Sequence, residues 1–161
     1  TGSGCLIITL NKFLTGYFTA IDISTDALEI AKINNQKHNT QVNFMEIDIL
    51  NEENKIKGKF DVIVSNPPYV TNSEKRSIRK NVLDYEPHLA LFVSDKDPLI
   101  FYSNIIKRSK NLLNLQGCLY FEINERFGLE ITQILIKEGF VNIELKKDIN
   151  GKDRMIKAVF K

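Results

Sequence analysis

The chain has 161 residues, of which 43% are hydrophobic and 26% charged. This length supports one domain with a core, and this balance excludes a disordered or fibrous protein. The net charge of +2 does not indicate a nucleic-acid partner, which usually requires a concentrated basic face. No stretch approaches the roughly 20 apolar residues of a membrane-spanning helix, and no signal peptide precedes the first charges. We therefore expect a soluble, cytoplasmic protein without a membrane partner.

Predicted helices and strands alternate in the first part of the chain. A helix is expected to open directly from the glycine-rich stretch "TGSG", because apolar residues without proline follow it. Ser24 is expected to cap a second helix, with Asp26 in the first turn, where the helix dipole favours negative charge. The expected elements are a helix over 5–14, a strand over 17–22, a helix from Ser24 to about His38, and strands over 42–47 and 60–65.

The second part of the chain predicts two more helices and three strands. Asp97 and Pro98 resemble an N-cap and a first helical residue, and apolar residues recur at helical spacing as far as Leu113. Gly139 is placed to end the last helix in a left-handed conformation. The expected elements are a helix over 97–113, a strand over 117–123, a helix over 128–138, and strands over 141–145 and 155–160 around the turn signal Asn150-Gly151.

Alternation of strands and helices indicates an α/β fold with a mostly parallel sheet, because a parallel neighbour is reached through a crossover connection. The last two strands have no helix between them and should be antiparallel. Such sheets bind ligands beyond the carboxyl ends of their strands. Asp22, Asp48 and Asn66 each come at the end of a predicted strand. We therefore expect these three side chains and the glycine-rich turn to line one edge of the sheet.

The glycine-rich turn and the two strand-end acids indicate a nucleoside-containing cofactor. Gly2 and Gly4 allow a tight turn with free amides, although a plain strand-to-helix turn explains them equally well. Asp22 is placed to accept hydrogen bonds from ribose hydroxyls. Asp48 and Ile49 could hold an adenine, and the alternative is that Asp48 is a solvated acid. No phosphate-binding motif G-x-x-x-x-G-K-[ST] occurs, and the absence of a third glycine disfavours NAD.

The stretch Asn66-Pro67-Pro68-Tyr69 is the candidate catalytic and substrate-binding loop. Proline has no N–H and a fixed φ, so the two prolines stiffen the loop and leave carbonyl acceptors. The Asn66 side-chain oxygen and the Pro67 carbonyl could both accept from a planar NH2 group, while Tyr69 stacks on its face. This arrangement positions a weak nitrogen nucleophile without an acid or base. The alternative is a Pro-Pro turn beside a buried tyrosine.

The remaining reactive side chains do not indicate chemistry. Cys5 and Cys118 lie in apolar runs and are expected to be small core residues. His38 and His88 lack the spacing of metal ligands, so no metal is expected. A basic cluster is either a solvated surface or, less favoured, a contact surface for an acidic partner; it comprises Lys75, Arg76, Arg79 and Lys80.

The motifs together resemble a known family. "TGSG", the two strand-end acids and "NPPY" are similar to S-adenosylmethionine-dependent methyltransferases that modify exocyclic or amide nitrogens. "YEPHLALF" over 85–92, "DPLIFY" over 97–102 and "DINGKDRMIKA" over 148–158 closely resemble the peptide chain release factor N(5)-glutamine methyltransferases. The resemblance covers essentially the whole chain.

The resemblance implies a Rossmann-like class I methyltransferase fold and a catalytic domain over 1–161. It implies methylation of the glutamine amide in the Gly-Gly-Gln loop of class 1 release factors, with S-adenosyl-L-methionine and no metal. The family's first strand and its N-terminal helical domain have no counterpart here, so we expect an incomplete cofactor site and lowered stability. By resemblance, Thr1, Gly2, Ser3 and Gly4 hold the methionine part of the cofactor, Asp22 the ribose, Asp48 and Ile49 the adenine, and Asn66, Pro67, Pro68 and Tyr69 the glutamine amide, with Asn66 also beside the cofactor.

Two kinds of alternative remain open from the sequence. The same loop serves ribosomal-protein glutamine methylases and nucleic-acid adenine methylases, but an adenine methylase should carry a target-recognition insertion and a strong basic face. A protein of another class would be a nonenzymatic module that binds a nucleoside.

Overall fold

The computed structural model describes residues 1–53, 56–77 and 87–161, with the side chains of residues 76 and 77 left undescribed. By contacts, the chain divides into two compact units, Thr1–Lys55 and Ile56–Lys161. Arg79, Lys80, and Tyr85 and Glu86 of the "YEP" motif lie outside the described residues, so the structure does not test the expectations made for them. The interpretation of residues 1–161 as one catalytic domain stays a prediction.

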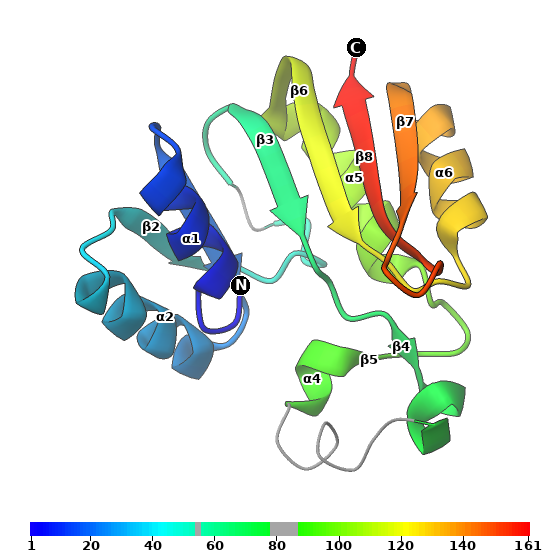
Figure 1. The fold of residues 1–161 in the computed structure, drawn as a ribbon, viewed down its shortest axis with the longest axis horizontal. Coiled ribbons are helices and arrows are strands. Elements are labelled where there is room, and N and C mark those ends of the chain that lie inside the picture. The colour runs from blue at the N-terminus through cyan, green and yellow to red at the C-terminus, as the bar shows by residue number, and fades with distance from the viewer. Residues whose placement is uncertain (54–55, 78–86) are drawn as a thin grey trace. The chain divides into compact units, whose positions relative to one another are not determined.

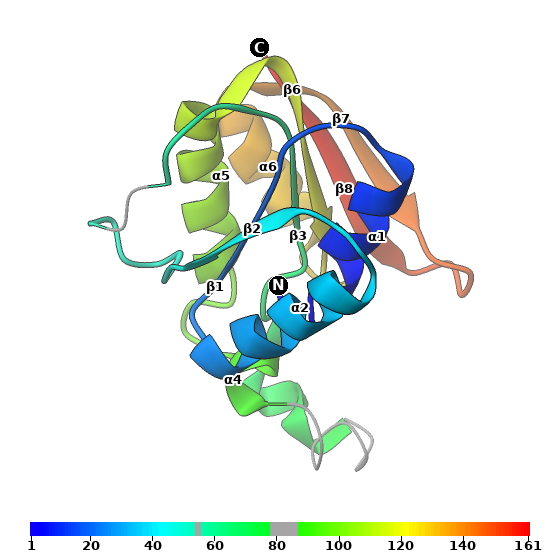
Figure 2. The same ribbon diagram turned by 90° about the vertical axis from the view of Figure 1, so that its left-hand side faces the viewer.

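The first unit consists of a two-stranded parallel sheet and two helices (Figures 1 and 2). Strands β1 (Phe18–Asp22) and β2 (Val42–Glu46) pair in parallel, from Phe18 opposite Val42 to Asp22 opposite Glu46. Helix α1 (Cys5–Phe13) precedes β1, and α2 (Thr25–Lys37) connects β1 to β2. Both helices pack on the sheet. The predicted helices and strands of this segment are confirmed to within two residues at their ends.

The start of α2 has the local chemistry expected from the sequence. The Ser24 side chain accepts a hydrogen bond from the Ala27 N–H at 3.2 Å, and Asp26 lies in the first turn. Leu28 and Ala31 are buried. The cap therefore fixes the start of α2 directly after β1, and the residues just before α2 are available at the strand end.

The second unit contains a four-stranded sheet in the order β3-β6-β8-β7, with α5 and α6 behind it in Figure 1. Strand β3 is parallel to β6, whereas β8 is antiparallel to both β6 and β7, as predicted for the last two strands. A separate parallel pair, β4 and β5, lies beside short helical segments. The elements are β3 (Phe60–Ser65), β4 (Val70–Thr71), η1 (Asn72–Ser77), α4 (His88–Leu91), β5 (Phe92–Val93), α5 (Ile100–Leu112), β6 (Leu113–Glu122), α6 (Gly128–Lys137), β7 (Phe140–Lys147) and β8 (Asp153–Phe160).

Strand β6 is the centre of the core of the second unit. It pairs with both β3 and β8, and its alternate residues Leu119 and Phe121 point into the core together with Ile123 just beyond its end. Tyr102 of α5 packs edge-on against Phe121, with ring centroids 5.3 Å apart. The end of β6 is therefore held rigidly, because residues on three elements pack around it. The fully buried side chains of this core also include Ile106, Leu113, Ile131, Leu135 and Ile156.

The predicted beginning and end of the helix over 97–113 are wrong. Helix α5 begins at Ile100 with Leu99 as its N-cap, and no side chain caps it. The Asp97 carbonyl instead accepts the Ile100 N–H across a turn at 3.4 Å. Leu113 belongs to β6, where it is 1% exposed. A buried leucine fits both a helical face and the start of a buried strand, so spacing alone could not separate the two.

The expectation that both cysteines are core residues is wrong for Cys5. Cys5 is exposed at the start of α1, and Cys118 is half-buried on β6; both are free. The apolar run that contains Cys5 is one turn of an amphipathic helix, and this residue falls on its outer side while Ile8 is buried. A run of apolar residues therefore does not show which of its members are buried.

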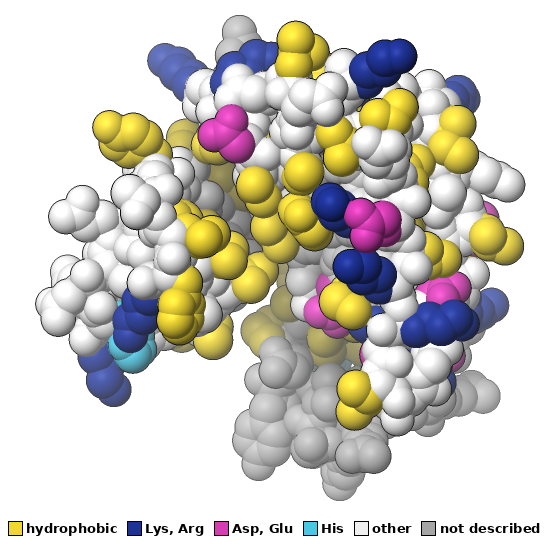
Figure 3. Space-filling model, turned by 45° about the horizontal axis from the view of Figure 1, so that its top comes forward, with side chains coloured by type: hydrophobic (Ala, Val, Ile, Leu, Met, Phe, Trp, Pro, Cys, Tyr) yellow, Lys and Arg dark blue, Asp and Glu magenta, His cyan; other side chains and the backbone are white. Residues whose placement is uncertain are grey.

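The face of the four-stranded sheet opposite α5 and α6 carries partly exposed hydrophobic side chains. Val62 is 52% exposed, Val64 40%, Tyr120 36% and Met155 44%. Figure 3 shows hydrophobic side chains gathered over the second unit beside charged ones. Within the described ranges, no helix is long and apolar enough to cross a membrane.

Two leucines of β6 provide a matched test of the core. Leu119→Ala should lower the free energy of unfolding by about 2–5 kcal/mol, because Leu119 is fully buried and its truncation leaves a cavity. Leu115→Ala removes the same atoms from a side chain that is 76% exposed and should change stability by at most about 0.5 kcal/mol. Denaturant unfolding of both variants checks this, and equal losses would contradict the position of the core.

Candidate functional site

The glycine-rich loop has two glycines in left-handed conformations that serve different purposes. Gly2 has φ 56° and Gly4 φ 78°. A Cβ on Gly4 would lie 3.1 Å from Ala31 Cβ and 3.1 Å from Ile8 Cδ1, so this glycine lets the loop pack closely on α2. A Cβ on Gly2 would meet nothing within 4 Å. The open space suited to a ligand therefore lies at Gly2 rather than at Gly4.

Asp22 holds the loop at the carboxyl end of β1. Its Oδ2 accepts the Gly2 N–H at 2.9 Å and lies 3.0 Å from the Thr1 amino group, while Oδ1 accepts the Ser24 N–H at 3.0 Å. Burial raises the pKa of Asp22, but the hydrogen bonds from Ser24 and Gly2 and the nearby amino group outweigh it and leave the pKa below its ordinary value. Asp22 is therefore ionised at neutral pH.

Asp22 retains capacity for a ligand. An ionised carboxylate offers about four acceptor positions, and the backbone N–H groups of Gly2 and Ser24 occupy one on each oxygen. Acceptor capacity therefore remains for a ribose hydroxyl. The residues present fit the nucleoside part of a cofactor, with an ionised acceptor beside the open space at Gly2.

Asp48 and Ile49 follow β2 and come from the same edge of the two-stranded sheet as Asp22. The register pairs Asp22 with Glu46, and the Ile47 N–H donates to the Asp22 carbonyl at 2.9 Å. Asp48 Oδ1 accepts the Leu50 N–H at 2.8 Å, which shapes the turn that contains Ile49. Both residues are half-buried. The first unit therefore brings the two predicted strand-end acids to one sheet edge.

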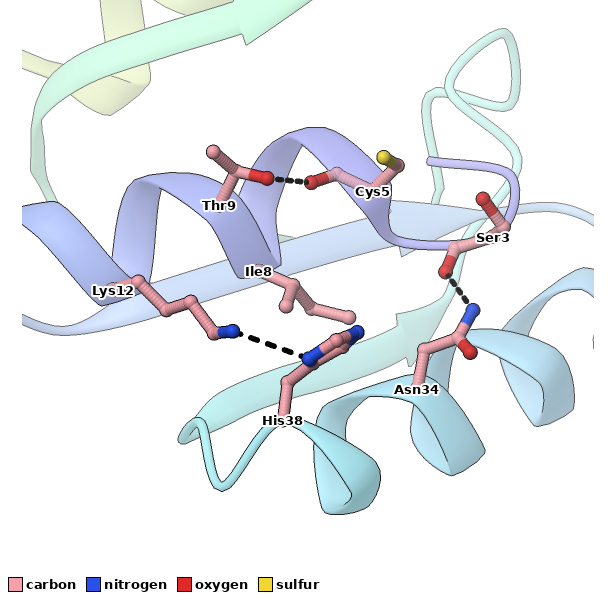
Figure 4. Close-up of a pocket in the computed structure, with 7 residues that line it drawn as sticks. All are labelled: Ser3, Cys5, Ile8, Thr9, Lys12, Asn34 and His38. Atoms are coloured by element: carbon pink, nitrogen blue, oxygen red, sulfur yellow. Dashed lines mark hydrogen bonds between the residues drawn. The ribbon is translucent and has the colours of Figure 1, made fainter.

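A depression of about 190 Å3, which no sequence pattern predicted, lies between α1 and α2 (Figure 4). Lys12 Nζ lies 3.1 Å from His38 Nδ1, and the Asn34 side chain donates to the Ser3 carbonyl at 2.9 Å. Of the residues predicted to hold the cofactor, Ser3 alone lines this depression, so it is distinct from the space at Gly2. The lining residues are Ser3, Cys5, Ile8, Thr9, Lys12, Asn34 and His38.

The Asn66–Tyr69 loop leaves β3 at its carboxyl end, as predicted. Asn66 is exposed, and its side chain makes no hydrogen bond with any described residue, whereas Pro67 is buried. A depression of about 100 Å3 opens beside the loop, large enough for a small planar group. Pro68 does not line it. The lining residues are Asn66, Pro67, Tyr69, Val70, Ala90 and Leu91.

Tyr69 is held at both ends by residues from the end of β6. Its hydroxyl donates to Glu122 Oε1 at 3.1 Å, and its carbonyl accepts from the Asn124 side-chain amide at 3.1 Å. Burial and the adjacent Glu122 carboxylate both raise the pKa of Tyr69. The phenol is therefore neutral at physiological pH and acts as a hydrogen-bond donor.

Glu74 connects the segment that follows the Asn66–Tyr69 loop to residues just beyond β6. Its Oε2 accepts the Thr71 N–H at 3.0 Å, the Thr71 hydroxyl at 2.8 Å and the Asn124 amide at 3.0 Å. Arg126 lies 3.4 Å from Oε1. Burial raises the pKa of Glu74, but these hydrogen bonds outweigh it and lower the pKa below its ordinary value. Asn124, which is 6% exposed, thus bridges Glu74 and Tyr69.

In the sequence, Glu122 ended a predicted strand but had no assigned role, and Asn124 and Glu74 were missed. A signal existed in the spacing Glu122-x-Asn124 at a strand end, because alternate residues of an extended chain point to the same side while Ile123 enters the core. The predicted site residues fall in two units, Thr1–Gly4, Asp22, Asp48 and Ile49 in the first and Asn66–Tyr69 in the second. Their common edge stays a prediction. No group of three or more potential metal ligands occurs among the described residues.

Glu74→Gln should make stability less sensitive to acid. A carboxyl group whose pKa falls on folding stabilises the protein above its unfolded value, and this stabilisation is lost as the pH drops through the folded value. The variant should therefore be less stable than the unchanged protein at neutral pH, and the difference should shrink below the ordinary pKa of 4.5. Denaturant unfolding at several pH values measures this. A difference that is constant with pH would contradict the ionised Glu74 network.

Comparisons with known proteins agree with this architecture. The chain is 50% identical to the release factor glutamine methyltransferase of Flavobacterium psychrophilum, over 100% of this chain and 56% of that protein. It is 45% identical to the release factor glutamine methyltransferase of Bacteroides thetaiotaomicron, over 98% of this chain and 57% of that protein. The chain thus spans somewhat more than half the length of these curated relatives.

A solved structure shares the fold. The crystal structure of a methyltransferase from Pyrococcus furiosus matches with a TM-score of 0.72 and 19% sequence identity, over 99% of this chain and 71% of that one. The fold class predicted from the sequence, an α/β methyltransferase fold with parallel pairing and an antiparallel C-terminal pair, is confirmed. The family model for the methyltransferase small domain matches residues 1–88. The chain therefore belongs to the methyltransferase small domain family.

Proposed function

We propose that this protein transfers a methyl group from S-adenosyl-L-methionine to the side-chain amide nitrogen of the glutamine in the Gly-Gly-Gln loop of peptide chain release factors. The observation that carries the proposal is the exposed Asn66 side chain, which has no hydrogen bond to a described residue and lines a small depression with Pro67 and Tyr69. The names of the relatives that match the whole chain support this choice of substrate. The reaction would take place in the cytoplasm, where release factors act on ribosomes.

The cofactor would be held by the first unit. The free acceptor position on Asp22 would take a ribose hydroxyl, and the open space at Gly2 would admit the methionine part over Thr1–Gly4. Asp48 and Ile49 would hold the adenine at the same sheet edge. When bound, this cofactor supplies a methyl group made electrophilic by a sulfonium.

The Asn66–Tyr69 loop would orient the nucleophile. An amide nitrogen is weakly nucleophilic, because its lone pair is delocalised into the carbonyl. Asn66 Oδ1 and the Pro67 carbonyl would each accept one N–H of the glutamine amide, which fixes the direction of the nitrogen, and the Tyr69 ring would cover the amide plane. Fixing the geometry of a weak nucleophile is worth several kcal/mol, up to about 7–11 in favourable cases.

The same two oxygens would stabilise the transition state. The nitrogen would gain positive charge as it bonds to the methyl carbon, while the bond from that carbon to the sulfonium breaks and leaves a neutral thioether. Neighbouring acceptor oxygens would stabilise the positive charge on the nitrogen. The nitrogen then loses one proton to solvent. The neutral phenol of Tyr69 donates to Glu122, so it is not positioned as the base for this proton.

Asn66→Ala is expected to reduce methyl transfer to a release factor at least about 100-fold, because it removes one of the two acceptors that aim the amide. Mass spectrometry of the release factor after incubation with S-adenosylmethionine measures the product. Asn43→Ala, which truncates an exposed asparagine on β2, is the matched control and should leave the rate unchanged. Unchanged turnover in the Asn66 variant would contradict the mechanism.

The same assay separates the alternatives. Methylation of a ribosomal-protein glutamine or of adenine in nucleic acid, with the release factor unmodified, would replace the proposed substrate. If the protein bound S-adenosylmethionine but methylated none of these, the nonenzymatic nucleoside-binding module would be favoured.

Asp22→Ala is expected to weaken S-adenosylmethionine binding at least about tenfold in calorimetry, because it removes the ribose acceptor and the contacts that hold the Gly2 turn. Asp26→Ala removes an exposed carboxylate four residues along the chain and is the control. Equal affinity in the two variants would show that Asp22 does not hold the cofactor.

A further inference from the structure

We propose that Glu122 is a positioning residue for methyl transfer, because it fixes the ring of Tyr69 in the orientation that receives the glutamine amide. This inference rests on the proposed function of the Asn66–Tyr69 loop. It assigns a role to a carboxylate that takes no direct part in the proposed methyl transfer.

Glu122 is the last residue of β6, and the backbone at this point is fixed by burial and by several hydrogen bonds. Ile123, which follows it, is 0% exposed, and the Glu122 carbonyl accepts the Tyr102 hydroxyl at 3.2 Å. Arg154 of β8 donates to the Ile123 carbonyl at 3.2 Å, and its own carbonyl accepts the Ile123 N–H at 2.9 Å. The backbone that carries the Glu122 side chain therefore has little freedom to move.

The loop itself needs such an external anchor. Pro67 and Pro68 have no N–H, so two successive residues cannot donate to a neighbouring strand. Tyr69 compensates through its two ends, because the side chain donates to Glu122 and the carbonyl accepts from Asn124. The second contact fixes the backbone of Tyr69, and the first fixes the torsion of its side chain.

The contact between Tyr69 and Glu122 limits where the ring can lie. A tyrosine in a half-open depression can adopt more than one rotamer, and a bond at the far end of the ring selects one of them. Glu122 lies beyond the hydroxyl and is not among the residues that line the depression, so it would not touch the substrate. Misplacement of positioning groups by about 1 Å can lower a rate about 100-fold. Loss of the Glu122 contact should therefore lower kcat more than it raises KM for the peptide.

Arg154 also interacts with the Tyr69 phenol, and it lies 3.5 Å from Asp148. The Tyr69 hydroxyl therefore has both a carboxylate and a guanidinium near it. Replacement of Glu122 by glutamine keeps an acceptor oxygen for Tyr69, whereas replacement by alanine removes it.

The test is a double-mutant cycle on kcat with a Gly-Gly-Gln peptide as substrate. Glu122→Ala and Tyr69→Phe should each lower kcat about 10-fold to 100-fold, with the S-adenosylmethionine dissociation constant unchanged. The double variant should lose no more than the larger single loss, since both single changes delete the same hydrogen bond. Glu122→Gln should recover most of the rate lost in the alanine variant.

Glu144→Ala is the control, because it removes a carboxylate of the same sheet that pairs with Lys157 at 3.0 Å on the exposed side of β7. It should leave kcat unchanged. A purely structural role of Glu122 would instead lower the melting temperature and the amount of folded protein without changing kcat per folded molecule. Tyr69→Phe, which removes only the half-buried hydroxyl oxygen, keeps the test valid if Glu122→Ala does not fold.

Two results would overturn the inference: unchanged kcat in both single variants, or losses that add in the double variant. These outcomes are distinct from failure of the proposed function, which would appear as an unchanged protein that does not methylate the peptide.

Discussion

Two consecutive prolines set the constraint on which the candidate substrate site depends. Pro67 and Pro68 stiffen the loop after β3 but provide no N–H groups, so the loop cannot be secured by a strand-to-strand ladder. In the structure, residues at the end of β6 provide the hydrogen bonds that secure the loop. Glu122 and Asn124 bind the hydroxyl and the carbonyl of Tyr69, while the Asn66 side chain makes no hydrogen bond with a described residue.

The position of β6 explains why the anchor can be rigid. This strand lies between β3, which delivers the loop, and β8, which supplies Arg154. Its inward side chains form the core with α5 and α6, while the Glu122 side chain at its carboxyl end reaches Tyr69. The packing that holds β6 in the core therefore also holds the residues that position the Asn66–Tyr69 loop. Asn124 extends this link to Glu74, so the segment that follows the loop is held by the same buried amide.

Sequence patterns predicted most of the elements because their signals were local. The Ser24 cap, the β3 run and Gly139, which has φ 89°, depend on neighbouring residues and were confirmed. The start of α5 was misplaced, because a turn through Pro98 competes with an N-cap at Asp97. Burial of Cys5 was wrong, because an apolar run does not define the inner side of a helix.

Only the residues proposed to contact the cofactor or the substrate could be predicted from the sequence. Strand-end acids and the proline loop stand out in the sequence because they are unusual at those places. The partners Glu122, Asn124 and Glu74 are ordinary polar residues, two of them more than fifty positions beyond Tyr69, and only the pairing of β3 with β6 brings them to it. Gly4 was expected to allow a tight turn and, by resemblance, to contact the cofactor. The structure confirms the turn, with Ala31 and Ile8 close to the side where a Cβ would lie, and the cofactor contact stays a prediction.

A crystal structure of the protein with a Gly-Gly-Gln peptide and the demethylated cofactor would locate the glutamine amide. We expect the amide nitrogen within about 2.7–3.2 Å of both Asn66 Oδ1 and the Pro67 carbonyl oxygen, with the Tyr69 ring over the amide and its hydroxyl still bound to Glu122. A glutamine side chain bound away from this loop, or a Tyr69 ring turned away from Glu122 when the peptide is bound, would contradict this expectation.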